Sequence, residues 1–248
     1  MQISFFEEFP TKKNLNKLKL VADKAKLYLA AHSIKEFSTI SRQLSRDKIK
    51  EVIYWPILSK KEGYWISPFS KREALKRVFS ELKDQRIPLM LDLELPTTKN
   101  PLLYFTQFFN FFRNKRLIHQ FIERYSEQIY LAEYYPEGKR KEKILEFLGL
   151  HYSNPKLRVI KMLYHSLHHF DKEFMINELK RGRKEFGDNY LVALGTIARG
   201  INGNEPLLSS AQLNQDLNLV KKYGVKEVII FRLGGLNKEY LKIIERFG

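Results

Sequence analysis

The chain has 248 residues, and its 44% hydrophobic and 13% aromatic content is too high for a disordered protein. It contains no cysteine, which excludes disulfides, thiol catalysis and thiolate metal sites. The net charge of +16 favours anionic partners, but the basic residues are scattered and form no continuous stripe, so nucleic-acid binding is not expected.

The start of the chain and its hydropathy bear on where the protein works. Residues 1–6 run directly into Glu7 and Glu8, without the basic start or the long apolar stretch of a secretory signal. No uninterrupted apolar run has the length of a membrane span. We therefore expect a cytoplasmic protein with no membrane partner.

Short runs rich in Ile, Val, Leu and Tyr alternate along the chain with longer charged segments of helical periodicity. The expected strands begin near Ile3, Leu27, Val52, Leu89, Ile129, Val159, Leu191 and Val228. The expected helices are residues 12–25, 34–50, 70–85, 101–126, 138–149, 171–186, 205–223 and 237–247. Eight such pairs predict an α/β fold, a single (β/α)8 TIM barrel over residues 1–248. An open doubly wound sheet would alternate similarly, but no glycine-rich phosphate loop follows any of the strands.

The expected helix 101–126 is rich in aromatic residues. The residues that share one stripe are Leu102, Phe105, Phe108, Phe109 and Phe112, and the two beside it are Tyr104 and Phe111. Burial against the barrel wall explains such a stripe. A homodimer or ligand contact explains it as well, and the sequence leaves both explanations open.

The apolar run that ends in Asp92-Leu93-Glu94 is the most informative stretch of the sequence. It has the character of a buried strand, so Asp92 and Glu94 point to the same face, with α-carbons ~7 Å apart. Acids in such a place are costly unless they are hydrogen-bonded or used. Because barrel enzymes form their sites at the carboxyl ends of strands, we predict a functional pair of carboxylates at the barrel mouth. The structural alternative is a pair of acids leaving the core.

The other strand ends and the loops after them bring further polar and aromatic residues to the same mouth. The candidates for substrate binding are Glu8, His32, Trp55, Trp65, Glu133, Tyr135, His165 and Arg232. Aromatic rings stack on the apolar faces of sugars, and carboxylates bind hydroxyl groups and move protons. The combination predicts a carbohydrate substrate, with neither a metal nor a cofactor.

Residues 91–96, Leu-Asp-Leu-Glu-Leu-Pro, are similar to the fourth-strand signature of the chitinase-like family 18 glycoside hydrolases, Asp-x-x-Asp-x-Asp-x-Glu. Residues 162–165, Met-Leu-Tyr-His, resemble that family's Met-x-Tyr-Asp, with His in place of Asp. Met90 departs from the signature, because it stands where the family has an Asp. The resemblance implies glycoside hydrolysis on a TIM barrel, with Asp92 and Glu94 as the catalytic pair.

The resemblance also implies substrate-assisted hydrolysis of an N-acetylhexosaminide, because two carboxylates on one strand face cannot flank a glycosidic bond from opposite sides. Glu94 would be the general acid, and an ionised Asp92 would raise the pKa of Glu94 and orient the acetamido group. Tyr164 would hydrogen-bond that group or the attacking water. If Glu133 on the next strand faces the mouth, it opposes Glu94 and gives an ordinary two-carboxylate glycosidase.

Two alternatives involve other residues of the same mouth. Lys161 lies in the sixth expected strand, where class I aldolases of barrel fold hold their Schiff-base lysine, but it falls on the face opposite to Tyr164. A non-catalytic barrel that binds an acidic polymer or a protein would instead pair Glu94 with Arg232 and plug the mouth.

A third alternative is a metal site in the segment after the sixth strand. The residues with suitable side chains are His165, His168, His169 and Asp171. Their spacing matches no familiar zinc motif, and a polar loop that opens a helix explains them equally.

Overall fold

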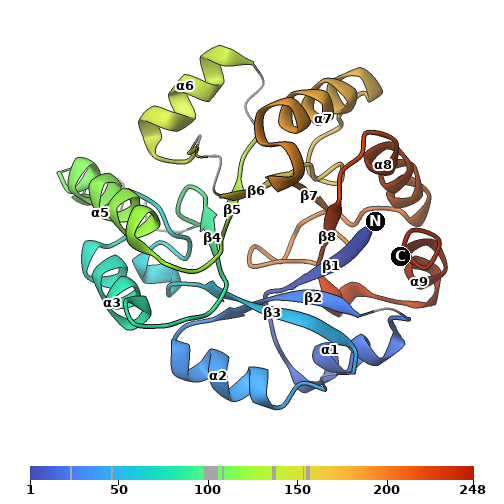
Figure 1. The fold of residues 1–248 in the computed structure, drawn as a ribbon, viewed down its shortest axis with the longest axis horizontal. Helices are drawn as coiled ribbons and strands as arrows, with labels where there is room; N and C mark the ends of the chain where they lie inside the picture. The colour runs from blue at the N-terminus through green and yellow to red at the C-terminus, as the bar shows by residue number, and fades with distance from the viewer. Residues whose placement is uncertain are drawn as a thin grey trace.

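Eight parallel strands form a closed barrel in the computed structural model of the protein (Figure 1). The strands are β1 (Gln2–Glu7), β2 (Ala25–Ala31), β3 (Ile49–Pro56), β4 (Leu89–Leu93), β5 (Ile129–Glu133), β6 (Arg158–Met162), β7 (Tyr190–Gly195) and β8 (Glu227–Phe231). They pair in chain order, and β8 pairs with β1. The structure describes residues 1–22, 24–45, 47–97, 106–107, 109–135, 138–152, 154 and 157–248. The predicted (β/α)8 barrel is confirmed, and the open sheet is wrong.

Helices form a ring around the barrel (Figure 1). They are α1 (Lys12–Leu15), α2 (Ile34–Arg42), α3 (Arg72–Leu82), α5 (Phe111–Arg124), α6 (Lys139–Leu148), α7 (Lys172–Phe186), α8 (Ser210–Lys222) and α9 (Lys238–Ile244). Short 3-10 turns are η1 (Asn16–Leu20), η2 (Lys60–Glu62), η3 (Gly187–Asn189) and η4 (Leu233–Gly235). The first helical segment is shorter than predicted, because Val21 after η1 is extended and buried. Within the described residues, no helix combines the length and the apolar character needed to cross a bilayer.

The interior of the barrel is filled by large side chains from alternate strand positions. Phe6 on β1 contacts the rings of Tyr28 and Trp55, with ring centroids 5.3 and 5.4 Å apart. Tilted aromatic pairs of this kind stabilise a core beyond the area they bury. The same alternation on β4 points Met90 and Asp92 inward.

Charged and hydroxyl side chains close the amino end of the barrel, and we call Ser4, Lys26, Tyr28, Glu51 and Glu227 the floor cluster. Lys26 Nζ lies 2.9 Å from the Glu227 carboxylate and 3.6 Å from that of Glu51. Glu227 also accepts hydrogen bonds from Ser4 Oγ at 2.7 Å and Tyr28 OH at 3.0 Å. Strands β2, β3 and β8 begin earlier than predicted. Their first residues include inward-facing polar side chains of the floor cluster, which interrupt the apolar pattern from which the strand starts were predicted.

We expect Lys26→Met to lower the free energy of unfolding by about 3–5 kcal/mol, because the buried Glu227 carboxylate loses its ammonium partner. Urea unfolding followed by circular dichroism measures the change. Lys24→Met, at an exposed lysine just before β2, is the matched control and should shift stability by less than about 0.5 kcal/mol. Equal stability of the two variants would show that the floor pair contributes nothing.

The aromatic segment at the start of α5 places its phenylalanines on both sides. Phe111 is buried and packs against Phe69, with ring centroids 5.1 Å apart. Phe109 and Phe112 are 87% and 68% exposed, so the explanation by burial against the barrel wall is wrong for these two residues. Phe111, expected beside the stripe, is instead the buried ring, on which Phe69 and Phe147 pack. The other members of the stripe, Leu102, Phe105 and Phe108, lie outside the described residues, as does Tyr104 beside it. Self-association through this helix stays a prediction.

Candidate active site

A cavity opens at the carboxyl ends of the strands. Its lining residues are Phe6, Glu8, Trp55, Trp65, Asp92, Glu94, Thr97, Met162, Tyr164, Leu167, Thr196, Gly200, Ile201, Asn202, Glu205 and Phe231. The predicted site residues among them are Glu8, Trp55, Trp65, Asp92, Glu94 and Tyr164. The structure therefore brings the three predicted catalytic side chains to one place.

Asp92 and Glu94 form a hydrogen-bonded pair of carboxyl groups in this cavity. Asp92 lies on β4, and Glu94 is the first residue after that strand. The two residues are two positions apart, so strand alternation points both side chains inward. Burial raises the pKa of Glu94 to about 7. Burial and the neighbouring Glu94 raise the pKa of Asp92 well above its usual range. The predicted ionised Asp92 is therefore replaced by a pair of acids that shares a proton at neutral pH.

Two tyrosines surround this pair. Tyr134, which follows β5, donates a hydrogen bond to Glu94 Oε2 at 3.1 Å. Tyr164, which follows β6, lines the cavity beside Phe231, with ring centroids 5.8 Å apart. Burial raises the pKa of both phenols, so both remain hydrogen-bond donors at neutral pH.

Glu8, which follows β1, is a third acid of the cavity. Its Oε1 accepts a hydrogen bond from Tyr64 OH at 2.8 Å. Its buried Oε2 has no hydrogen-bond partner among the described residues. Burial raises the pKa of Glu8 to about 7, and the neighbouring carboxylates of Glu205 and Glu94 add to the rise. Glu8 therefore changes its charge in the neutral pH range.

Trp55 and Trp65 form an aromatic wall of the cavity. Their rings are nearly parallel, at an interplanar angle of 5° and a centroid distance of 5.9 Å. Trp65 Nε1 donates to Thr97 Oγ1 at 3.1 Å, which fixes the plane of that indole. Trp55 Nε1 is buried and has no acceptor within the described part of the chain. The wall thus offers apolar ring surface and one N–H donor that a ligand can use.

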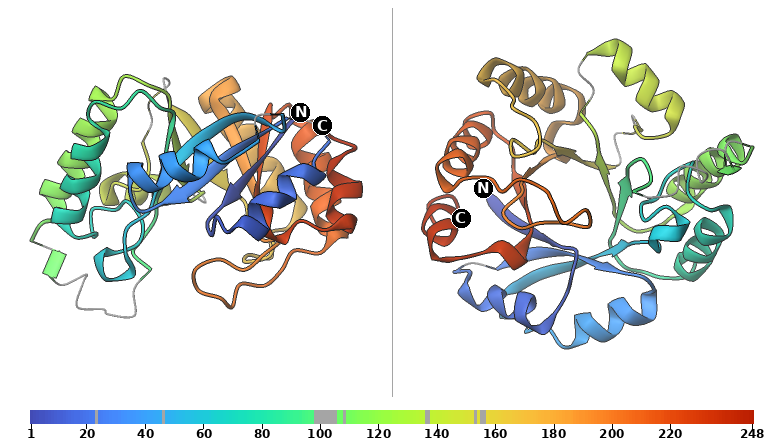
Figure 2. Two further views of the ribbon diagram at one scale, coloured as in Figure 1. Left: turned by 90° about the horizontal axis from the view of Figure 1, so that it is seen from below. Right: turned by 180° about the vertical axis from the view of Figure 1, so that it is seen from behind.

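The long loop between β7 and α8, drawn in orange, lies across the end of the barrel (Figure 2). Lys60 Nζ donates a hydrogen bond to the backbone oxygen of Ile201 at 3.2 Å, which attaches the loop to the opposite side of the mouth. A Cβ on Gly200 would lie 3.0 Å from Glu8 Oε2 and 3.2 Å from Glu205 Oε1, so glycine allows the close approach. The loop adds Glu205, whose carboxylate accepts hydrogen bonds from the backbone N–H groups of Gly200 and Asn202.

Glu133 does not reach this cavity, and its predicted place at the mouth is wrong. As an odd-numbered residue of β5 it points outward, whereas Tyr130 and Ala132 point inward. Its carboxylate lies 2.6 Å from Lys161 Nζ and 2.7 Å from His151 Nδ1, buried between the strands and the helices. Lys161 is likewise outside the barrel interior, as strand parity predicted, so it does not face the cavity where the aldolase alternative needs it.

Tyr135 and His165 also lie outside the cavity, so their predicted place is wrong. The Tyr135 ring packs against Phe170, with centroids 4.9 Å apart, on the outer side of the barrel. His165 faces α8, where Nδ1 lies 3.1 Å from Asp216 Oδ1. In both cases the chain leaves its strand and turns outward one residue after an inward-facing tyrosine.

Arg232 follows β8 but binds Glu7 rather than Glu94. Its Nη1 lies 3.0 Å from Glu7 Oε1, and Nε donates to the backbone oxygen of Arg199 at 3.0 Å. The arginine plug expected of a non-catalytic barrel is therefore not formed. His32 is exposed and lines a second hollow beside the main cavity.

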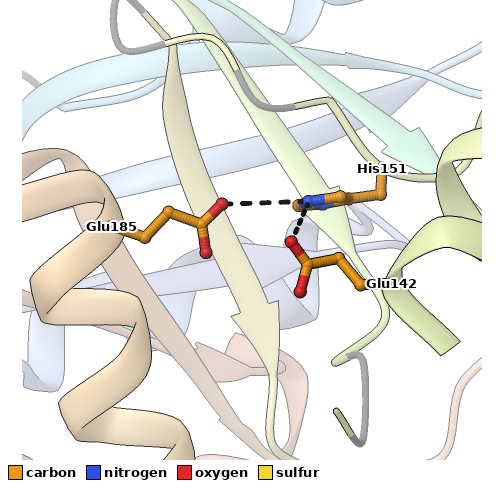
Figure 3. Close-up of side chains that lie close together, drawn as sticks. All are labelled: Glu142, His151 and Glu185. Atoms are coloured by element: carbon orange, nitrogen blue, oxygen red, sulfur yellow. Dashed lines mark ion pairs between the residues drawn. The ribbon is translucent and has the colours of Figure 1, made fainter. Parts of the chain in front are cut away.

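One group of side chains has the composition of a metal site, and it lies away from the cavity (Figure 3). His151 Nε2 is 4.0 Å from Glu142 Oε1 and 3.9 Å from Glu185 Oε1. Glu142 also binds Arg181 at 3.3 Å, so a cationic side chain already balances the charge of that acid. Within the described residues, the histidines of segment 165–171 form no such group, and Asp171 caps α7 by accepting from Phe174 N.

Sequence reasoning missed two residues that shape the cavity: Thr97 and Glu205. Both lie on loops, where no periodic pattern reports the direction of a side chain. Tyr64 and Tyr134 follow strand ends, as residues expected at the mouth, and they donate hydrogen bonds to Glu8 and Glu94.

Comparisons with known proteins give structural likeness only. No protein-family model matches the chain, and no curated protein matches its sequence. The PgaB (BpsB) glycoside hydrolase domain from Bordetella bronchiseptica is 11% identical, with a TM-score of 0.54 over 97% of this chain and 95% of that chain. A chitinase from Bacteroides thetaiotaomicron is 7% identical, with a TM-score of 0.58 over 99% and 96%.

A barrel named for other chemistry is equally similar. The xylose isomerase domain protein from Planctomyces limnophilus is 8% identical, with a TM-score of 0.57 over 99% of this chain and 94% of that chain. The likeness therefore establishes the TIM-barrel fold alone. The substrate and the catalytic residues must be argued from the cavity itself.

Proposed function

We propose that the protein is a glycoside hydrolase that cleaves a glycan at an N-acetylhexosamine, with Glu94 as the general acid. The observation that supports this best is the hydrogen-bonded Asp92–Glu94 pair in a mouth cavity walled by Trp55, Trp65 and Tyr164. A carboxyl group with a pKa of about 7 keeps a large fraction of its protonated form at neutral pH, as a general acid must. Several of the similar barrels are named chitinases, which agrees with this substrate class.

In the proposed reaction the 2-acetamido group of the sugar is the nucleophile. Glu94 gives its proton to the glycosidic oxygen while the acetamido oxygen attacks the anomeric carbon, and the leaving sugar departs as an alcohol. Asp92 accepts a hydrogen bond from the acetamido N–H and stabilises the positive charge of the cyclic intermediate. Tyr164 donates to the acetamido oxygen. Glu94, now ionised, takes a proton from the water that opens the intermediate, which restores the acid.

A second mechanism is favoured by one observation, the position of Glu8. This carboxyl group lines the same cavity from β1, while Glu94 enters it from the end of β4. Two carboxyl groups on different sides of a sugar can act as acid and nucleophile without any acetamido group. Glu8 would then hold the position that the sequence suggested for Glu133.

A set of aryl glycosides with and without a 2-acetamido group distinguishes the two mechanisms. Release of the aryl alcohol from the acetamido sugars alone supports substrate assistance, and release from both supports Glu8 as the nucleophile. If the wild-type protein cleaves none of them and binds no oligosaccharide, the glycoside hydrolase proposal is wrong.

We expect Asp92→Asn to move the alkaline limb of the pH–rate profile to lower pH. Burial and the neighbouring Glu94 raise the pKa of Asp92 well above its usual range, so the two carboxyl groups together keep their last proton to a higher pH than a single carboxyl group would. Asp92→Asn leaves Glu94 as the only acid of the pair. Because the protonated acid is the active form, the variant loses activity at a lower pH, and its maximal rate falls about 10²-fold.

The measurement is kcat against pH for the wild type, Asp92→Asn and the control Asp84→Asn, at an exposed residue far from the cavity. An alkaline limb that stays in place in Asp92→Asn would show that the two acids do not share the catalytic proton.

A further inference from the structure

The cavity is acidic, although the protein is strongly basic. Its charged lining residues are Glu8, Asp92, Glu94 and Glu205, and none of the described residues that line it is Lys, Arg or His. The whole chain carries 44 Lys and Arg residues against 28 Asp and Glu, so a lining without any basic group is an unusual local composition. Such a site disfavours anionic sugars and favours neutral or cationic ones.

Two carboxyl oxygen atoms of this lining accept no hydrogen bond from the described residues. Glu8 Oε2 and Asp92 Oδ1 are buried acceptors with no hydrogen-bond partner among the described residues. Glu8 as a whole is only 2% exposed, and its Oε2 lies 3.0 Å from the point where a Cβ of Gly200 would stand. A buried acceptor without a donor costs free energy, which a ligand donor placed there would recover.

Acids and aromatic rings surround the carboxylate of Glu8, and the nearby cation whose charge acts on it, Arg232, is itself paired with Glu7. Glu8 Oε2 and Glu205 Oε1 both lie within 3.2 Å of the single point where a Cβ of Gly200 would stand. Tyr64 fixes the other oxygen of Glu8, and its ring packs edge-on against Trp65, with centroids 4.3 Å apart. Two carboxylates beside aromatic rings attract a cation through both charge and the ring faces.

Glu8 also stands between two hollows of the mouth. The cavity with Asp92 and Glu94 lies on one side, and the hollow lined by His32 lies on the other. Glu8 and Ile201 belong to both linings, so a glycan chain that passes from one hollow to the other crosses Glu8. The sugar at this crossing is a neighbour of the sugar at the Asp92–Glu94 pair.

We propose that Glu8, assisted by Glu205, is a subsite for an unacylated 2-amino sugar, so that the substrate is a partly N-acetylated glycan with a free ammonium group next to the cleaved residue. The inference rests on the proposed hydrolase function, which supplies the acetamido sugar at Asp92 and Glu94. The ammonium donates hydrogen bonds to Glu8 Oε2 and Glu205 Oε1, and the aromatic rings of Tyr64 and Trp65 flank the site.

Binding of an amine at this subsite is coupled to the release of a proton from Glu8. The pKa of Glu8 is raised to about 7 by burial, so a fraction of Glu8 is neutral at pH 7. A bound ammonium stabilises the ionised form, so Glu8 releases a proton when the amine binds. An N-acetylated sugar carries no charge and releases none from this group.

The test is isothermal titration calorimetry at pH 7 with two probes. One, the amine tetramer, is a β-1,4-linked tetramer of alternating glucosamine and N-acetylglucosamine, and the other is the same tetramer fully N-acetylated. Every protein carries Glu94→Gln, so that no probe is cleaved. The variants added to it are Glu8→Gln, which keeps the shape of the side chain, and the control Glu73→Gln, at an exposed residue of α3. Two buffers of different ionisation enthalpy give the number of protons released.

We expect the amine tetramer to bind about tenfold more tightly than the acetylated one, as for one hydrogen-bonded charge. Glu8→Gln should bring this ratio to about one and abolish the proton release, whereas Glu73→Gln should change neither. Three results would overturn the subsite. The protein with Glu8 unchanged could bind the amine tetramer no more tightly than the acetylated one, Glu8→Gln could leave the ratio of the two affinities unchanged, or neither tetramer could bind. Hydrolysis of aryl glycosides is scored separately: cleavage without amine preference refutes the subsite alone, and amine preference without cleavage refutes the hydrolase alone.

Discussion

Glu94→Gln is expected to reduce kcat by about 10²–10⁴-fold while the protein stays folded. Gln keeps the size of the side chain and can still accept the hydrogen bond of Tyr134, but it has no proton to give to the glycosidic oxygen. The measurement is kcat and KM on an aryl 2-acetamido glycoside, together with the thermal midpoint. We expect KM to change little, because the proton transfer belongs to the transition state.

Two results would speak against this role of Glu94. Full activity of Glu94→Gln would show that another group supplies the proton. An equal loss in Glu127→Gln, at an exposed glutamate in the turn before β5, would show that the loss has no connection with the cavity. A leaving group of low pKa needs no protonation and should recover much of the rate in Glu94→Gln, which is a readout that unfolding cannot produce.

Lys161→Met is expected to lower the free energy of unfolding by about 3–5 kcal/mol, because it leaves the Glu133 carboxylate buried without a cation. Lys161 Nζ lies 2.6 Å from Glu133 Oε2 and 3.2 Å from His151 Nδ1, in a place that solvent does not reach. Urea unfolding measures the change. The control is Lys184→Met, at an exposed lysine of α7, which should alter stability by less than about 0.5 kcal/mol.

Under conditions where Lys161→Met is still folded, its kcat should equal that of the wild type, since Lys161 does not contact the cavity. Loss of turnover without loss of structure would revive a catalytic lysine. So would a borohydride-trapped adduct of Lys161 with a carbonyl compound, because only a Schiff base is reduced in this way.

The barrel itself was predictable because every strand carries an apolar run that the helical segments interrupt regularly. The prediction failed at the strand starts, where Lys26 and Glu227 face inward and are stabilised by each other rather than by apolar contacts. A single sequence cannot show this, since the partner of each charge lies on a different strand. The same difficulty applies to the phenylalanines at α5. Phe111 is buried because it contacts the ring of Phe69, and Phe109 and Phe112 of the stripe are exposed.

For the site, strand parity was the reliable guide and position at a strand end was not. Parity placed Asp92, Glu94 and Lys161 correctly, because side chains alternate strictly while the strand lasts. Glu133 was assigned from its position alone, and parity with Tyr130 would have turned it outward. Beyond the end of a strand, side chains no longer alternate strictly, so the direction of a side chain cannot be predicted from parity. His165 therefore faces Asp216 outside the cavity, and Glu205 lines the cavity from a loop.

The interior of the barrel divides into two ends with a layer of aromatic rings between them. The paired charges of the floor cluster lie at one end, and the cavity acids Glu8, Asp92 and Glu94 lie at the other. Phe6 and the rings that it contacts separate the two ends. Substitutions at separated sites act independently on stability, so the mouth can diverge while the floor and the ring layer keep the fold. The loops rather than the strands should therefore be sampled when the specificity of this barrel is redesigned.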